Sequence, residues 1–574
     1  MNTDREQVVK EIQEKKTDRF EKIGSFMCPT AKVGKWYVYF SIAMIAIALI
    51  ATATVIYFIV GPMEGYLHSD YTDTIYWADA SYTSGKVFNP DFKYAALLPF
   101  SANIWFIPLI AIFGVSMRAQ VIGMVVFAIL LIASLYFMCR SLKWSMPWTA
   151  FTISAFLMIM SSSDKLREIM WGHVIYYSLI LIVIFFGLGL VSRFSEMKLG
   201  LNAKSIVYGG LIFVFFTLVG TDGFQIISMS TLPIACAFFA ERFFDKERDL
   251  LDKHNAVSYG IVGGLLLSSV MGLALLKVLK GDMVANYAEG QSNISPMNTW
   301  MDHLLAFPED WFSLLGFNGD RTLPLLEKST LLMMINFAVA LIILVMPMIL
   351  LFNYKHIEDK GTKLILWVHV VVSAVTMFGW ICGYLSSANW RLTSMAGTAV
   401  ITTVAAIRFF VLRSKVIKTP VPARLASVIA IFISLAALLN FNTIRKMPVN
   451  YGQNNALHYL TAKLEEEGLE YGYATFWRSQ AITLLSDSKV KTRMILADSD
   501  KGVWTDFYQN CYSWYKDQEG VDRYFVLLTM AERNNALRCD EWKEFVISQD
   551  PEIIQLEGYV IYIFDRNINI EIPE

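Results

Sequence analysis

The chain has 574 residues, of which 55% are hydrophobic and only 17% charged, and its mean hydropathy is +0.45. An average soluble domain carries about 25% charged residues. The apolar residues come in blocks of about 20, the length that a helix needs to cross a bilayer, and the net charge of −1 gives no bias toward nucleic acid. These numbers exclude a soluble enzyme, a disordered scaffold and a small disulfide-rich secreted protein. They predict a polytopic membrane protein.

The chain opens with a charged arm, residues 1–35, which holds eight Lys or Arg and six Asp or Glu. The arm has no apolar core, so it is expected to be cytoplasmic and not a cleaved signal peptide. Residues 36–60 then run without a charge and predict the first membrane span. Ten further spans are expected, at about 119–138, 147–161, 173–192, 205–219, 224–241, 256–276, 328–353, 364–385, 392–412 and 425–440.

The apolar segment 97–114 is interpreted as an interfacial or re-entrant piece, because Pro99 and Pro108 interrupt it. The distribution of basic residues supports this reading. With the segment left out, the presumed cytoplasmic pieces hold 24 Lys or Arg in 91 residues and the external loops hold 9 in 130. Counting the segment as a span would put the basic clusters outside, against the positive-inside rule. Eleven spans place the N-terminus inside and the C-terminus outside.

This topology predicts a transmembrane domain over 36–440, with long external loops at 61–118 and 277–327, and an extracytoplasmic domain over 441–574. The tail reads as α/β, with a helix at 454–467 and strands at 489–495, 524–529 and 559–564. It has no GxGxxG, P-loop or nucleophile-elbow motif, so its own chemistry cannot be read. If the tail is external, Cys511 and Cys539 could form a disulfide.

The first external loop carries two acids, Asp70 and Asp73, ten and thirteen residues beyond the first span. Three residues apart, they would share a face on a helical turn. Ser69 or Asp70 is expected to cap a helix over 74–84, which Gly85 would end. The alternative is that both acids are helix caps or solvated loop residues.

The second external loop places Asp164 and Glu168 at i and i+4, beside Arg167 and His173. Carboxylates on both loops of one membrane face could hold a divalent cation, or supply a base beside a phosphate-binding cation. The alternative is an ordinary capped helix start with an ion pair. Arg391 opens a late span at the same face, where it either snorkels or binds an anionic head group.

The spans themselves are nearly free of ionisable residues, whereas ion-coupled carriers usually bury acids or cations at mid-membrane. This favours chemistry at the external surface over transport. A lipid-linked saccharide flippase or other transporter, and a non-catalytic scaffold with an external binding domain, stay open as alternatives.

The chain resembles the GT-C superfamily of membrane glycosyltransferases, in particular bacterial members of the protein mannosyltransferase and aminoarabinose transferase type. The shared plan is a first span, an external loop with an early Asp, an interfacial helix ending in a small residue and Gly, and a Pro-containing stretch leading to Phe-Gly. Here those parts are Asp70 or Asp73, Ser84 and Gly85, Pro90, Pro99 and Pro108, and Phe113 and Gly114. The chain departs from the family in lacking an Asp-Glu pair in the loop and a proline pair before the second span.

The resemblance implies transfer of a sugar from a polyprenyl-phosphate donor to a hydroxyl of a cell-surface glycan, lipid or protein, with inversion at the sugar. It implies Asp70 or Asp73 as the general base. It further implies a donor-phosphate site of Arg391, Arg167 and His173, and a divalent cation, Mg²⁺ or Mn²⁺, if one is used, on Asp164 and Glu168. The donor's isoprenoid tail would lie among the spans and its phosphate at the external rim. The lipid bilayer is a further expected partner, and no nucleic-acid partner is expected.

Overall fold

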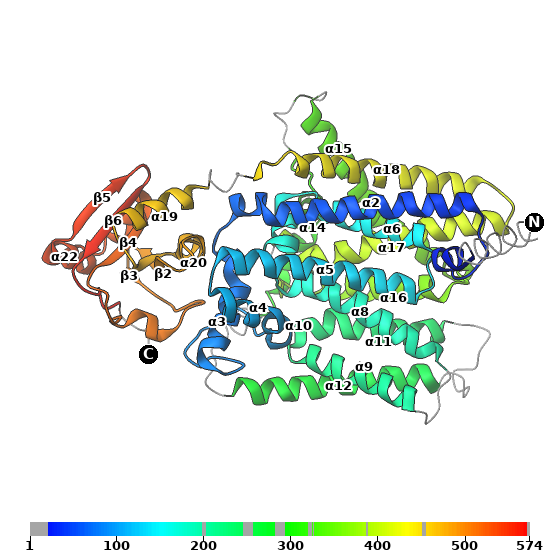
Figure 1. Cartoon of the computed structure of the whole chain (residues 1–574), viewed down its shortest axis with the longest axis horizontal. Coiled ribbons are helices and arrows are strands. Elements are labelled where there is room, and N and C mark those ends of the chain that lie inside the picture. The colour runs from blue at the N-terminus through cyan, green and yellow to red at the C-terminus, as the bar shows by residue number, and fades with distance from the viewer. Residues whose placement is uncertain are drawn as a thin grey trace, which may run out of the picture.

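The structure is a computed structural model that describes residues 21–197, 203–244, 256–281, 293–319, 324, 327–385, 388–449 and 455–570. The first 20 residues of the predicted arm, and parts of the loops at 198–202, 245–255 and 282–292, lie outside the described residues. A long bundle of helices carries a sheet domain on one of its ends (Figure 1). We call this end of the bundle the domain end.

Ten helices within the described ranges are long and apolar enough to cross a membrane, with lengths of 18 to 28 residues. They are α2 (Lys35–Val60), α5 (Met117–Ser141), α8 (Tyr176–Glu196), α9 (Ala203–Gly220), α10 to α11 (Phe224–Phe243), α12 (Ala256–Lys280), α15 (Lys328–Phe352), α16 (Lys360–Ile381), η8 with α17 (Asn389–Val416) and α18 (Val421–Arg445). Each falls on a predicted span, so the chain is a multi-pass membrane protein.

Two shorter apolar helices complete the bundle. Helix α6 (Met146–Ile159) falls on the predicted span 147–161, but with 14 residues it is shorter than the ten long helices. Helix α4 (Pro99–Phe113) has 15 residues, about 22 Å of helix, which is short of a bilayer's hydrocarbon core of about 30 Å. It runs through Pro108 without a break, unlike the interruption expected there, and packs beside α3 (Asp73–Ser84) at the domain end (Figure 1). The start of α2 lies at the opposite end from the sheet domain.

The C-terminal domain is a six-stranded mixed sheet with the order β3-β2-β1-β4-β6-β5. Strands β1 (Tyr471–Thr475), β2 (Lys491–Asp498) and β4 (Tyr524–Thr529) run parallel, whereas β3 (Gly502–Trp504), β5 (Glu552–Leu556) and β6 (Tyr559–Phe564) pair antiparallel with their neighbours. Its helices are α19 (Ala456–Glu466), α20 (Phe476–Leu485), α21 (Met530–Ala536) and α22 (Asp540–Gln549). The predicted α/β tail is therefore correct, and the structure adds strands β1, β3 and β5. Cys511 and Cys539 are both free thiols.

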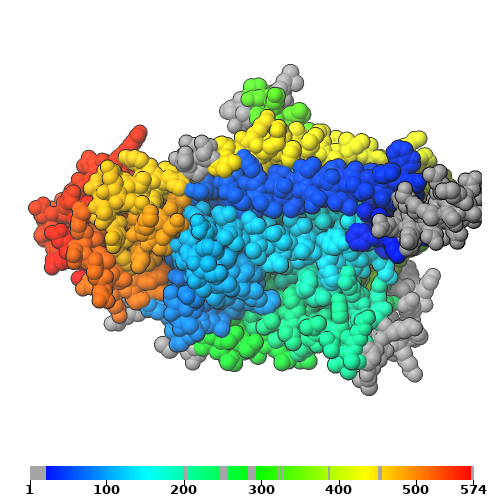
Figure 2. Space-filling view, viewed as in Figure 1, coloured from blue at the N-terminus to red at the C-terminus, as the bar shows by residue number. Residues whose placement is uncertain are grey.

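The C-terminal domain packs directly on the first loop, residues 61–98, as the space-filling view in Figure 2 shows. Isolated β-bridges pair Phe92 with Cys511 and Lys93 with Tyr508. The start of α19 is tied to the 3₁₀ turn η1 (Pro62–Tyr66), which follows α2, because His458 Nε2 lies 2.7 Å from Glu64 Oε1. The domain therefore closes over the loop that carries the two predicted catalytic acids.

Candidate active site

The first loop folds into a short 3₁₀ turn, η2 (Ser69–Thr72), followed by α3. Helix α3 ends as predicted at Gly85. The φ of Gly85 is 64°, in the left-handed region that glycine adopts without strain. The predicted capping by Ser69 or Asp70 is wrong. The N-cap is Thr72, with no side-chain cap bond, because the hydroxyl of Ser69 donates instead to the carbonyl of Phe476 in the C-terminal domain.

The second loop forms a one-turn helix, α7 (Asp164–Arg167), and then a π-helical turn, η3 (Glu168–Gly172). Ser163 caps α7, and Asp164 pairs with Arg167, as the alternative interpretation expected. The Asp164 side chain is 71% exposed and the Arg167 guanidinium is buried, donating to the Ser161 carbonyl at 2.7 Å. Glu168 points elsewhere, so the structure does not bring Asp164 and Glu168 together as cation ligands.

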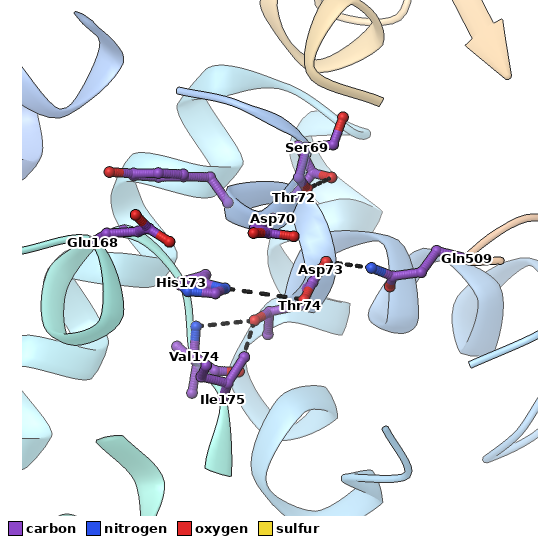
Figure 3. Close-up of polar contacts among 12 residues, drawn as sticks. Ser69, Asp70, Thr72, Asp73, Thr74, Glu168, His173, Val174, Ile175 and Gln509 are labelled. Atoms are coloured by element: carbon purple, nitrogen blue, oxygen red, sulfur yellow. Dashed lines mark hydrogen bonds and ion pairs between the residues drawn. The ribbon is translucent and has the colours of Figure 1, made fainter. Parts of the chain in front are cut away.

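Buried hydrogen bonds fix the two loops against each other. Gln120 of α5 donates from Nε2 to the carbonyls of both Tyr71 and Gly172, at 2.8 Å each. Thr74 Oγ1 donates to the Val174 carbonyl at 2.9 Å and accepts from its N–H at 3.1 Å (Figure 3). The loops therefore form one rigid surface at the domain end.

This surface holds a group that we call the carboxylate cluster: His68, Asp70, Asp73 and Glu168. Figure 3 shows its three acids. His68 lies between two of the acids, with Nε2 at 3.6 Å from Glu168 Oε2 and Nδ1 at 3.9 Å from Asp70 Oδ2. Asp73 lies deeper, where its carboxylate accepts a hydrogen bond from Gln509 Nε2 and approaches His173 Nδ1 at 4.0 Å. The structure thus brings together Asp70, Asp73, Glu168 and His173 from the predicted set.

The pKa values of the cluster's acids shift in different directions. Burial raises the pKa of Asp70, with the charge of Glu168 adding to the rise and His68 opposing it. Burial also raises the pKa of Asp73 well above its ordinary value, against the hydrogen bond from Gln509. For Glu168, burial acts upward, but the bonds from His68 and Lys165 outweigh it and lower the pKa to about 2. Glu168 is therefore the permanent negative charge of the cluster.

Lys165 is a cation of the site that the sequence patterns did not single out. Its Nζ lies 2.7 and 2.6 Å from the two carboxylate oxygens of Glu168. It also lies 4.9 Å from the centre of the Trp390 ring, next to Arg391 in the chain. Lys165 therefore links the carboxylate cluster to the predicted phosphate-binding arginine.

The three predicted phosphate ligands do not lie together. Arg167 is bonded to Asp164 and Ser161, and His173 is buried, which lowers its pKa to about 4 and leaves it uncharged at neutral pH. Arg391 differs from both because it lines a cavity. Its Nε is buried without a hydrogen-bond partner among the described residues, as are Arg167 Nε and both ring nitrogens of His173. Arg391 is thus the member of the predicted set that combines an unused donor with a place on the cavity wall.

The cavity beside Arg391 has a volume of about 1030 Å³ and is formed by helices α8, α11, α12 and α16. Its walls are mainly apolar and aromatic, including Leu97, Phe224, Leu232, Leu273, Leu276 and Phe378. Charged side chains gather on it as well, from Lys280, Asp222 and Arg391. An apolar chamber with cations suits an amphiphile with an anionic head group.

Three side chains of the carboxylate cluster could hold a metal ion. One ligand atom each of His68, Asp70 and Glu168 lies within 4.8 Å of the others. His68 Nδ1 is buried without a hydrogen-bond partner among the described residues, which fits a ligand role. In the structure, however, Lys165 already neutralises both oxygens of Glu168.

Two further features of the site could not be predicted from local patterns. Gln509 reaches the cluster from a loop of the C-terminal domain, where nothing in its neighbourhood marks it as functional. Trp477 packs its ring edge-on to His68, with ring centroids 5.5 Å apart. The Phe476-Trp477 pair at the start of a helix is an ordinary apolar signal. Only the fold brings these side chains to the loop.

The bundle, the two loops and the C-terminal sheet domain define a polytopic membrane protein. The crystal structure of ArnT from Cupriavidus metallidurans bound to undecaprenyl phosphate has this fold, with a TM-score of 0.50 and 9% identity over 91% of this chain and 97% of that one. ArnT in the apo state gives a TM-score of 0.41 at 11% identity over 92% and 98%. The Archaeoglobus fulgidus oligosaccharyltransferase complex with Zn and sulfate gives 0.45 at 11% identity over 86% and 70%. No protein-family model and no curated protein matches the sequence.

Proposed function

We propose that the protein is a membrane glycosyltransferase that moves a sugar from a polyprenyl-phosphate donor to an acceptor hydroxyl. The observation that carries the proposal is the juxtaposition of an apolar cavity, a cavity-lining arginine and a carboxylate cluster at one end of the bundle. The apolar cavity would hold the carrier lipid, and the arginine would bind its phosphate. A carboxylate of the cluster would take the proton of the acceptor hydroxyl. The fold shared with ArnT, whose structure holds undecaprenyl phosphate, supports the same reading.

The donor's isoprenoid chain would occupy the cavity of about 1030 Å³, and its phosphate would lie at Arg391. The unpartnered Nε of Arg391 supplies a charge-assisted hydrogen bond that strengthens as the phosphate leaves with a second negative charge. Lys165, close to Trp390, adds a positive charge on the side of the carboxylate cluster. Both cations favour departure of polyprenyl phosphate.

Asp70 is proposed as the general base in preference to Asp73. The Asp70 side chain is 31% exposed, whereas Asp73 is 11% exposed and bonded to Gln509. The acceptor oxygen attacks the anomeric carbon, its proton passes to Asp70, and the bond from that carbon to the phosphate oxygen breaks. The electron pair of this bond leaves with polyprenyl phosphate. In-line displacement inverts the anomeric centre, and base assistance of this kind contributes about 10²–10⁴-fold.

A divalent cation would be held by His68, Asp70 and Glu168, in place of the pair Asp164 and Glu168 that the sequence suggested. When bound, it would supply positive charge toward the leaving phosphate. Binding requires Lys165 to release Glu168, because its ammonium group contacts both carboxylate oxygens. Metal dependence is therefore tested by chelation and titration of the purified protein, with His68→Ala as the variant that loses a ligand.

The reaction is proposed to take place on the external face of the cell membrane. The sheet domain and both loops lie at one end of the bundle and the start of α2 lies at the other (Figure 1), which agrees with an inside N-terminus given the bias in basic residues. Labelling of single cysteines introduced at each end in sealed vesicles tests this orientation.

The decisive experiment measures release of polyprenyl phosphate by the full chain in nanodiscs. The substrates are a panel of polyprenyl-phosphate monosaccharides, with a cell-surface extract as the acceptor. Release that depends on the acceptor supports the proposal. Absence of release with every donor, together with translocation of lipid-linked sugar across liposomes, would favour the flippase alternative.

A further inference from the structure

The parallel strands of the C-terminal domain end toward the membrane domain. Strand β1 has β2 on one side and β4 on the other, so the strand order reverses between β1 and β4. Ligands of open α/β sheets bind outside the carboxyl ends of the strands at such a reversal. Here those ends are Thr475 and Thr529, and the next residue after β1, Phe476, accepts the hydrogen bond from Ser69 of the first loop. The reversal point thus faces the carboxylate cluster.

A carboxylate and a guanidinium are fixed at this reversal point. Glu532 accepts hydrogen bonds from Thr475 Oγ1 and from the N–H of Thr529, both at 2.8 Å, and pairs with Arg478. Arg478 also lies 5.9 Å from the centre of the Tyr559 ring. Its Nε is buried and has no hydrogen-bond partner within the part of the chain that the structure describes. The pair therefore keeps an unused donor in a fixed position.

Trp477 precedes Arg478 in the chain, at the start of α20, and is 56% exposed. Tryptophan is usually heavily buried, so an indole open to solvent beside a proposed catalytic loop needs a reason. Its ring packs edge-on to His68, and His68 in turn lies 3.9 Å from Asp70. A molecule stacked on Trp477 therefore lies beside the proposed base.

The chemistry of these three side chains matches a saccharide. A pyranose ring has a face of C–H groups, polarised by the neighbouring oxygens, that packs on the electron-rich face of an indole. Its hydroxyl groups both donate and accept, which a carboxylate and a guanidinium satisfy with charge-assisted hydrogen bonds. We propose that Trp477, Arg478 and Glu532 form an acceptor subsite that binds a saccharide and presents its hydroxyl to Asp70. This inference rests on the proposed glycosyltransferase function and names its acceptor class.

The test compares acceptor and donor kinetics of the full chain in nanodiscs, with defined oligosaccharides as acceptors. Trp477→Ala is expected to raise the acceptor KM at least tenfold, and to raise it at least tenfold more than the donor KM. Trp477→Tyr, which keeps an aromatic face, restores most of the loss. Ile547→Ala removes an exposed apolar side chain on α22, far from the bundle (Figure 1), and serves as the control that keeps parent kinetics.

The outcomes separate the subsite from the reaction. If the parent transfers sugar and Trp477→Ala keeps the parent's acceptor KM, or if peptides replace saccharides as acceptors, the subsite is wrong and the proposed function stands. If the parent shows no transfer, saturation-transfer NMR of an oligosaccharide with the full chain decides the subsite alone. Saturation transfer to the oligosaccharide that the parent shows and Trp477→Ala lacks supports the subsite. Absence of saturation transfer in the parent overturns the subsite.

Discussion

Gln509 of the C-terminal domain donates a hydrogen bond to Asp73 of the first loop, 436 residues earlier in the chain. The same amide accepts from Trp77 Nε1 at 2.7 Å, and both carboxamide bonds are buried. These two hydrogen bonds of Gln509, which we call the polar lock, therefore join the C-terminal domain to the loop that carries the proposed base. A domain that merely covered the site would not need such a contact.

Replacing Gln509 with leucine should loosen the lock at nearly constant volume. The change leaves the Trp77 N–H and the Asp73 carboxyl without their buried partner, at a cost of about 1–3 kcal/mol for each unsatisfied group. We expect Gln509→Leu to lower the thermal unfolding midpoint and to reduce transfer about tenfold. Gln518→Leu is the matched control, because Gln518 bonds to main-chain oxygens within its own loop. Equal midpoints for the two variants would show that the lock does not stabilise the protein.

The sequence predicts the parts of the site that depend on local pattern. Ten of the eleven predicted spans, the helix that ends at Gly85 and strands β4 and β6 follow from hydropathy, periodicity and glycine. The short strand β1 was missed, since its five residues include a glycine and follow a helix closely. Pairings between distant segments, such as His68 with Glu168, depend on packing that a single sequence does not encode locally.

One local expectation failed for a physical reason. Asp164 and Glu168, at i and i+4, were expected to hold a divalent cation together if one is used, but α7 has only one turn before the chain widens into the π-helical turn η3. Asp164 therefore pairs with Arg167, and Glu168 turns toward His68 and Lys165. The tertiary contacts of the two loops decide which carboxylate joins the cluster.

Arg391→Gln should weaken donor binding more than it weakens acceptor binding. The variant removes the positive charge that the cavity offers to the donor's phosphate, and hydrogen bonds to charged groups are worth about 1.5–3 kcal/mol. The expected result is a donor KM about 10 to 100 times higher. Arg445→Gln, at an exposed arginine, is the control. A donor KM equal to the parent's would remove Arg391 from the phosphate site.

The pH profile should report the raised pKa of Asp70. A general base must be ionised, so kcat/KM rises with pH through this pKa, and burial places the acid limb above the ordinary aspartate value of 3.8. Because the charge of Glu168 contributes to the rise, Glu168→Gln should move the acid limb to lower pH. The exposed Glu309, changed to glutamine, should leave the limb in place. An acid limb that moves upward in Glu168→Gln would contradict this assignment.

Asp222 should make stability depend on pH. Its carboxylate accepts from the Phe100 N–H at 3.0 Å and from the Ser101 hydroxyl, and burial raises its pKa to about 7. The folded state then holds a proton that the unfolded state releases near pH 4, so stability falls as the pH rises from about 4 to about 7. We expect Asp222→Asn to show a smaller drop in Tm between pH 5 and pH 8 than the parent. Asp500→Asn, at an exposed acid, should match the parent, and an unchanged drop in Asp222→Asn would refute the linkage.

The most direct test of the account is acceptor-dependent release of polyprenyl phosphate by the parent, Asp70→Asn and Asp73→Asn, measured side by side in nanodiscs. The account predicts that the parent turns over, that Asp70→Asn loses at least about a hundredfold in kcat, and that Asp73→Asn loses less than about tenfold. Turnover of Asp70→Asn at the parent's rate would contradict the assignment of Asp70 as the base.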